Sequence, residues 1–218
     1  MIRPLKPNPV PGSSVVNLSY SYIGVPLDTL TDDFNFVRFK LNSINDPGLS
    51  LSTNGVYDYL NHVTAYGTFI VLASSINVQV VNMDNDVPLR ISVTPTLENP
   101  NRVAAWTADS ALVNGNWSRY KVVGNATGND KTVITSAVDM GKLTGMGHLT
   151  PSSYELTGTT SGSSSGTTDP ATLGSWIIGC QALSSATDNV NVMLSVTIVY
   201  RVRFFNYLNP YWNGPTIN

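Results

Sequence analysis

Apolar and polar side chains alternate one by one along several stretches of the chain, which is the period of a β-strand with one buried face. The pattern is clearest near the C-terminus, where the apolar residues of one parity are Val192, Leu194, Val196, Ile198, Tyr200, Val202 and Phe204. Polar residues, among them Arg201 and Arg203, take the other parity. The same test predicts strands at 14–24, 33–41, 68–82 and 87–97, and weaker patterns predict strands at 117–124, 130–138 and 174–183. The chain is therefore predicted to form eight half-buried strands.

One short helix is predicted at 55–63, because Val56, Tyr59, Leu60 and Val63 are spaced three and four residues apart, which places them on one helical face. In strand 33–41, Val37, Phe39 and Leu41 are expected to face the core and Lys40 the polar side.

The links between the predicted strands alternate between short and long. Links after the first, third, fifth and seventh strands have roughly four to nine residues, and the others have about 19 to 36. In a jelly roll, successive connections leave opposite ends of the sandwich. We therefore predict an all-β protein with a single eight-stranded antiparallel jelly-roll β-sandwich at 14–206, with long loops at one end and one short helix. Residues 1–13 are an N-terminal extension and 207–218 a C-terminal tail. Such a block is thin at one end and thick at the other, as suits packing around a symmetry axis, although binding domains also carry long loops at one end.

The amino-acid composition is consistent with a β-rich protein but does not indicate a binding partner. Among 218 residues only 12% are charged, against roughly 25% in soluble domains. Lys and Arg number 12 and Asp and Glu 14, so the formal net charge is −2. No apolar run approaches the roughly 20 residues of a membrane-spanning helix, and no membrane association is expected.

The residues typical of catalysis are sparse. The histidines His62 and His148 lie far apart, and neither adjoins a serine in a strand-to-helix turn. The low-complexity segment 157–168 contains a loose Gly-X-Ser-X-Gly spacing but is interpreted as a mobile surface loop. The single cysteine, Cys180, lies in an apolar stretch and is expected to be a small buried hydrophobe. We expect no enzymatic activity and no cofactor.

Two acidic clusters, Asp32-Asp33 and Asp84-Asn-Asp86, carry the oxygen ligands that calcium prefers. They supply too few ligands for a closed site within one subunit, so either a neighbouring copy completes an interface site or these residues simply form turns. No metal site is assigned.

Several segments, in the right order, resemble the capsid proteins of circular Rep-encoding single-stranded DNA viruses, the circovirus-like group. They are FKLNSINDP at 39–47, GVYDYL at 55–60, YGTFIVLASSINV at 66–78, SWIIGCQ at 175–181 and VTIVYRVRFF at 196–205. The resemblance covers roughly residues 14–206. It implies one sheet of the first, eighth, third and sixth strands and another of the second, seventh, fourth and fifth. It also implies a T=1 shell of 60 copies around circular single-stranded DNA, part of a virion assembled inside the host cell, with the nucleus as the expected site, and recognised by an unidentified host receptor.

The resemblance further implies that the first sheet faces the genome. Lys131, Arg201 and Arg203 then become candidates for phosphate contacts, although ordinary solvated charges on a polar strand face would look the same. Members of that group usually begin with an arginine-rich arm, whereas this chain offers only Arg3 and Lys6 before the first strand. These two complete the candidate nucleic-acid-binding set, and we expect this chain alone to bind DNA weakly.

The aromatic tail offers Tyr207, Tyr211 and Trp212 as candidate subunit-interface residues, with packing inside the chain or base stacking as alternatives. Two other functions remain open: a coat protein of a small RNA virus with the same fold, and a carbohydrate-binding jelly-roll module. The module would favour an aromatic platform, but Trp106, Trp117, Trp176 and Trp212 are scattered along the chain.

Overall fold

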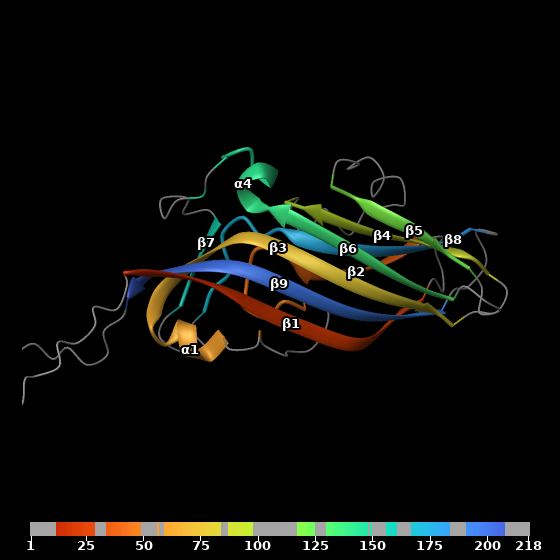
Figure 1. Ribbon diagram of the computed structural model, residues 1–218, viewed down its shortest axis with the longest axis horizontal. Helices are drawn as coiled ribbons and strands as arrows, with labels where there is room; N and C mark the ends of the chain where they lie inside the picture. The colour runs from red at the N-terminus through yellow and green to blue at the C-terminus, as the bar shows by residue number, and fades with distance from the viewer. Residues whose placement is uncertain are drawn as a thin grey trace, which may run out of the picture.

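The structure is a computed structural model with two β-sheets packed face to face (Figure 1). It describes residues 12–28, 34–48, 56, 59–83, 87–97, 117–124, 130–147, 149, 156–160, 167–183 and 191–207. Within these residues no helix is both long and apolar enough to cross a membrane.

Each sheet contains four long antiparallel strands. The first sheet has the order β1 (Ser13–Asp28), β9 (Asn191–Tyr207), β3 (Tyr66–Asn82) and β6 (Lys131–Asp139), and the short strand β7 (Thr157–Thr159) also pairs with β3. The second sheet has the order β2 (Phe34–Lys40), β8 (Ser175–Ala182), β4 (Leu89–Thr96) and β5 (Arg119–Val123). All eight predicted strands are present, and their division between the sheets is the one that the resemblance implies.

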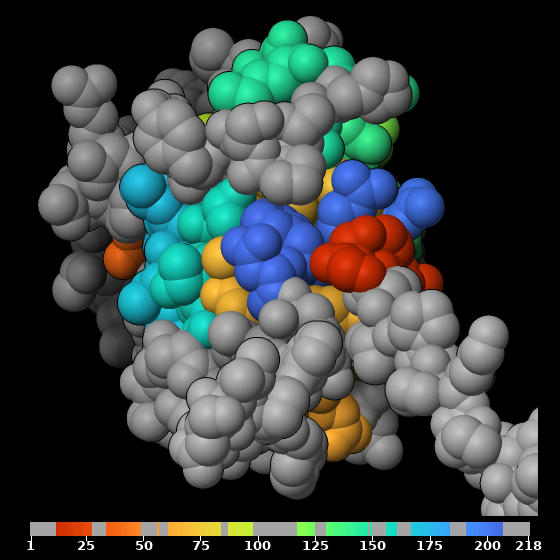
Figure 2. Space-filling model, turned by 90° about the vertical axis from the view of Figure 1, so that its left-hand side faces the viewer, coloured from red at the N-terminus to blue at the C-terminus, as the bar shows by residue number. Residues whose placement is uncertain are grey.

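The links divide between the two ends of the sandwich. Those after β1, β3, β5 and β8 span only 29–33, 83–88, 124–130 and 183–190, whereas those after β2, β4 and β6 span 41–65, 97–118 and 140–174. The helices α1 (Tyr59–Val63) and α4 (Met140–Leu143) and the strand β7 lie at the long-link end (Figure 1). Figure 2 looks onto this end and shows the start of β1 beside the end of β9.

The core lies between the sheets and contains the apolar parity of each strand. Leu89, Ile91 and Val93 of β4 are fully buried, as are Val192, Leu194, Ile198 and Phe204 of β9. Two side-chain hydrogen bonds cross it: Trp176 Nε1 donates to Ser74 Oγ at 2.9 Å, and the Tyr200 hydroxyl donates to the Lys40 carbonyl oxygen at 2.6 Å. Both link a strand of one sheet to a strand of the other, so they fix how the sheets are aligned as well as burying polar groups at low cost.

A β-bulge interrupts the alternation in β3. The register with β9 shifts between Val71 and Ala73. After the bulge Ser74, Ile76 and Val78 are buried, and the alternation predicts this for Ile76 and Val78. Leu72 has the same parity and was expected on the same face, but it is only partly buried. A bulge adds one residue to one strand, and this changes which parity faces the core.

The helices differ from the prediction. Helix α1 begins only at Tyr59, and Val56, which the prediction included, is not helical. Helix α4 was not predicted, because a single turn is too short to show a helical period. Asp139 caps it: its Oδ1 accepts a hydrogen bond from the Lys142 backbone N–H at 3.1 Å.

The interpretation of 157–168 as a mobile surface loop is wrong at both ends of the segment. Residues 157–159 form β7 against β3, and Thr168 N donates to the Thr159 carbonyl oxygen at 2.8 Å. Thr160 is buried and its hydroxyl donates to the Tyr66 carbonyl oxygen. Gly158 packs so closely that an added Cβ would lie 2.2 Å from Phe69 Cζ. Backbone pairing and a close approach order a polar segment here without apolar alternation.

Lys40 is also placed differently from the expected polar strand face. It is only 7% exposed, and its Nζ donates to Asp169 Oδ2 at 2.8 Å and to the Asn45 carbonyl oxygen at 2.7 Å. Ser43 Oγ donates to Asp169 Oδ1 at 2.6 Å. This ion pair joins the end of β2 to the segment before β8, and it pairs a charge that would otherwise be costly to bury.

Candidate nucleic-acid interface

The outward face of the first sheet is polar and carries few charges. Its outward side chains include Asn17, Ser19 and Ser21 of β1, Ser195, Thr197 and Arg201 of β9, Ser75, Asn77 and Gln79 of β3, and Lys131, Thr135 and Asp139 of β6. Hydroxyls and amides meet across the strands: Ser21 Oγ lies 3.2 Å from Thr197 Oγ1, and Asn77 Nδ2 donates to Thr135 Oγ1 at 3.4 Å. Such a face offers many hydrogen-bonding groups, interspersed with exposed apolar side chains such as Val15, Val133 and Val199.

Arg201 lies in the middle of a row that crosses this sheet. Its neighbours by register are Asn17 on β1 and Ala73 on β3, and Ala73 pairs in turn with Asp139 on β6. The side chain of Arg201 is exposed. It has no hydrogen-bond or ion-pair partner in the part of the chain that the structure describes. The guanidinium is therefore available to an anion.

Arg203 has the same parity as Arg201 but a different environment. It lies between Val15 of β1 and Ile70 of β3, is half-buried, and its Nε is buried without a hydrogen-bond partner among the described residues. A buried donor without a partner is costly, and an acceptor supplied from outside would remove that cost.

Lys131 lies on the same face but far from the two arginines. It pairs with Val81, eight residues along β3 from Ala73, which is the partner of Arg201. At about 3.3 Å per residue this separation is about 25 Å. The three predicted residues thus share one face but form two separate positive sites.

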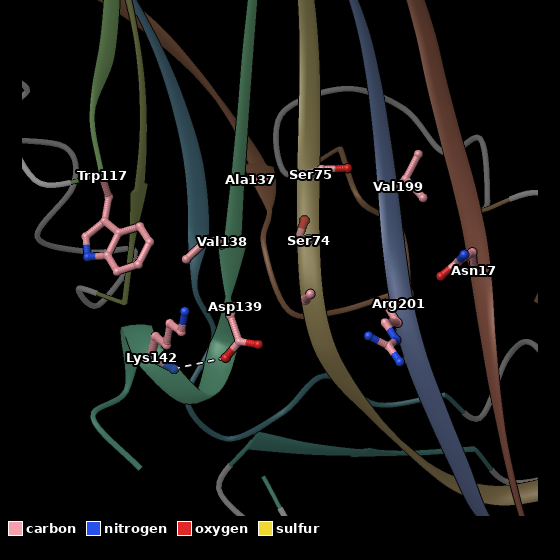
Figure 3. A pocket seen from close by; sticks show the side chains of 11 residues that line it. Asn17, Ser74, Ser75, Trp117, Ala137, Val138, Asp139, Lys142, Val199 and Arg201 are labelled. Carbon is pink, nitrogen blue, oxygen red and sulfur yellow. Dashed lines mark hydrogen bonds between the residues drawn. The ribbon is translucent and has the colours of Figure 1, made fainter. Parts of the chain in front are cut away.

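A pocket of about 390 Å³ opens on this face next to Arg201 (Figure 3). Small side chains, Ala73, Ser75 and Ala137, line its middle. Arg201, Val199 and Asn17 line one side, and Asp139, Lys142 and Trp117 the other. Arg201 and Asp139 are two strand spacings apart, about 10 Å. The pocket therefore has a guanidinium at one side and an indole with an ammonium at the other.

The second sheet contributes to this pocket through Trp117, which precedes β5 and packs partly against the core. Lys121 of β5 holds the two sheets together nearby, since its Nζ donates to the Val133 carbonyl oxygen of β6 at 2.7 Å. Sequence reasoning missed the pocket: Trp117 was noted only as one of four scattered tryptophans, and Lys142 lies on the helix that was not predicted. No periodic signal connects these residues, because they come from three separate segments.

The other candidate residues are only partly covered by the structure. Arg3, Lys6, Tyr211 and Trp212 lie outside the described residues, as do His148 and both acidic clusters considered for calcium. Tyr207 is the last residue of β9, opposite Tyr66 in the register with β3. Backbone pairing within its own sheet does not test whether Tyr207 contacts a second subunit, so that role stays a prediction.

Two side chains considered for catalysis, His62 and Cys180, pack against other residues of the fold. His62 stacks on Phe204, with ring centroids 5.1 Å apart. Cys180 is fully buried, as expected, and burial raises the pKa of its thiol to about 12. Burial likewise raises the pKa of Tyr200. Within the described ranges no three His, Cys, Asp or Glu side chains gather as a metal site would require.

Two facing antiparallel sheets with the strand orders β1-β9-β3-β6 and β2-β8-β4-β5 define a jelly-roll sandwich, and the protein is an all-β protein of this class. No protein-family model and no curated protein sequence matches the chain.

Solved structures of viruses share the fold. The chain is similar to the T=1 subviral particle of a Penaeus vannamei nodavirus capsid protein deletion mutant, with a TM-score of 0.50 and 9% identity, covering 89% of this chain and 98% of that chain. It is also similar to the Macrobrachium rosenbergii nodavirus structure, with a TM-score of 0.50 and 11% identity, covering 96% of this chain and 60% of that chain. At these identities the likeness establishes the fold alone.

Proposed function

We propose that this protein is the coat protein of a small icosahedral virus, and that copies of it assemble into a closed shell around nucleic acid. The observation that carries the proposal is the complete jelly-roll sandwich, with long links at one end, short links at the other, and unpartnered arginine groups on the outward face of the first sheet. The fold is shared with a deletion mutant of a nodavirus capsid protein that forms a T=1 subviral particle, and the match covers 98% of that mutant chain. In this proposal the chain acts as a structural protein and not as a catalyst.

The finer features of the proposal come from the sequence resemblance. They are a T=1 shell of 60 copies, an enclosed circular single-stranded DNA, a place in the virion with assembly in the host nucleus, and contact with an unidentified host receptor. The outward face of the first sheet is taken as the surface that meets the genome, as the resemblance implies, and Arg201, Arg203 and Lys131 all lie on it. The calcium possibility remains a proposal for residues outside the described ranges.

The test is the size of the purified protein in solution. Sixty copies of a 23.5 kDa chain give a particle of about 1.4 MDa. Light scattering coupled to size-exclusion chromatography should detect this mass, and negative-stain images should show closed particles of uniform diameter. A protein that stays monomeric over a wide range of salt and pH would contradict the proposal and leave the carbohydrate-binding module as the better interpretation.

The kind of nucleic acid is tested separately. Nucleic acid extracted from particles should be degraded by DNase and resist RNase if the genome is DNA. The reverse result would favour the coat protein of an RNA virus, which the sequence analysis left open, and would keep the shell-forming function intact.

A further inference from the structure

The pocket beside Arg201 combines two cations without partners. Arg201 on β9 and the ammonium of Lys142 on α4 both line it. Neither side chain makes a hydrogen bond or ion pair within the described part of the chain. The one carboxylate of the pocket, Asp139, already accepts the Lys142 backbone N–H through Oδ1. The pocket therefore has a net positive charge and suits an anion.

The same pocket carries an aromatic ring and a space large enough for a planar group. Trp117 lies at the side opposite Arg201 (Figure 3). Ala73 lies between Arg201 and Asp139 by register, and its small side chain, with those of Ser75 and Ala137, leaves the middle of the pocket open. The volume of about 390 Å³ falls within the range of roughly 300 to 1,000 Å³ that is typical of ligand pockets. Asn17 at one side and Ser75 in the middle add hydrogen-bonding groups.

Cations and an aromatic side chain in one groove are the features by which proteins hold single-stranded nucleic acid: the cations follow the phosphates and the ring stacks a base. The spacing fits, because Arg201 lies about two strand spacings, or about 10 Å, from the side of the pocket that holds Lys142 and Trp117. Arg203 continues the positive charge two residues further along β9.

We propose that this pocket binds one nucleotide of the enclosed single-stranded nucleic acid, with its phosphate at Arg201, its base against Trp117 and the adjoining phosphate near Lys142. The proposal rests on the proposed function in that it takes the outward face of the first sheet as the genome-facing surface. It adds a defined nucleotide site to what would otherwise be a diffuse positive surface. A neutral saccharide also stacks on tryptophan, but it would leave both cations without a counter-charge, so the charges favour a nucleotide over a neutral sugar.

Binding of short oligonucleotides tests the pocket. Fluorescence anisotropy with labelled dT12 and rU12 would compare wild type with Arg201→Ser and Trp117→Leu, and with Arg90→Ser, which removes the same charge from the outward face of the second sheet. We expect each pocket variant to bind about 10-fold more weakly. Arg201→Ser should also lower the slope of log K against log salt by about 0.7, which is the value for one phosphate contact on a single strand. Arg90→Ser should match wild type; equal weakening in Arg90→Ser would show that the effect is not specific to the pocket.

Photochemical crosslinking provides a second readout that does not depend on Trp117→Leu folding normally. Wild-type protein irradiated with a bromouracil-containing oligonucleotide should become crosslinked at Trp117, as located by mass spectrometry. Crosslinks elsewhere, unchanged affinity in Arg201→Ser, or binding that a neutral oligosaccharide displaces would overturn the pocket assignment. If particles contain nucleic acid but the pocket variants bind oligonucleotides as wild type does, the nucleotide site is rejected and the proposed function stands. If the pocket binds oligonucleotides but the protein never assembles, the shell-forming function is rejected and the nucleotide site stands.

Discussion

Burial in the core of the sandwich strongly disfavours the ionised form of the Cys180 thiol. The thiol lies on β8 among apolar side chains and is fully buried, and burial raises its pKa from 9.0 to about 12. The residue was predicted from its apolar neighbours in sequence to be a small hydrophobe, and the structure confirms this. Its chemistry is therefore suppressed by its position in the fold.

This pKa predicts how the free energy of unfolding depends on pH. The raised folded-state pKa means that the stabilising effect is fully present below pH 9 and is lost as pH rises from 9 to 12, because the unfolded thiol ionises first. At pH 10 the loss relative to pH 8 should be about 1 kcal/mol larger in wild type than in Cys180→Ala. Urea denaturation at the two pH values measures it.

The control for this prediction is thiol labelling. A disulfide reagent at pH 8 should leave native Cys180 unmodified and label it fully in denaturant. Rapid labelling of the native protein, or equal pH sensitivity in Cys180→Ala, would show that the thiol is not held in the core.

At the scale of elements, the alternation of side chains predicted the long strands because each has one face on a shared core. In β4, for example, Leu89, Ile91 and Val93 are all fully buried. The pattern could not predict the bulge in β3, since a register shift arises from pairing with β9 and not from the residues of β3 alone. Lys40 was misplaced for a related reason: its partner Asp169 is distant in sequence.

Strand β7 was beyond prediction for a different reason. Its residues, Thr157–Thr159, are polar or glycine and lie in a low-complexity segment. They are held by backbone pairing to β3 and by the absence of a side chain at Gly158, where a Cβ would collide with Phe69. Neither feature leaves a hydrophobic signal in the sequence.

Deleting residues 158–168 should therefore destabilise the protein, in contrast to the expectation for a mobile loop. The deletion removes most of β7, the buried Thr160 and Thr167, and the hydrogen bond from Thr160 to Tyr66. We expect a loss of at least about 2 kcal/mol, comparable to losing several hydrogen bonds that include buried groups. Thermal unfolding followed by circular dichroism would measure it.

A shorter deletion provides the matched control. Removing 163–165 keeps Thr160, Thr167 and the bridge between Thr159 and Thr168, and leaves a turn of permitted hairpin length. Its unfolding temperature should stay close to that of wild type. Equal stability of both deletion variants and wild type would mean that β7 contributes nothing to the fold.

At the scale of the whole molecule, the candidate site was only half predictable. Arg201 and Arg203 could be assigned to an outward sheet face because parity alone fixes their side of β9. The pocket could not be predicted, because Trp117, Lys142 and Arg201 belong to three segments that only the packing of the two sheets brings together. Tertiary proximity of this kind has no sequence period.

Exchange of Arg201 and Arg203 for serine tests the assigned face. Particles should still form, because neither arginine makes a hydrogen bond or ion pair within the described residues. Their nucleic acid content should fall, because two cations per copy are lost from a chain whose formal net charge is already −2. The ratio of absorbance at 260 nm to that at 280 nm in purified particles measures the change.

The control is the Arg90→Ser variant, which removes one positive charge from the outward face of the second sheet and is compared with Arg201→Ser alone as well as with the double variant. It should retain the wild-type nucleic acid content. Unchanged content in the double variant, or an equal fall in both, would remove the special role of the first sheet.

The position of β9 has a consequence for how the protein is made. This strand lies between β1 and β3, yet it is the last of the described strands in sequence, so β1 has no neighbour in its sheet until β9 has been made. At 5–20 residues per second, the ribosome needs roughly 10 to 40 s to go from the first strand to the last. The nascent chain cannot close its sandwich during that interval. A nascent chain without β9 therefore lacks the completed first sheet, and under the proposed function translation itself delays premature association between copies.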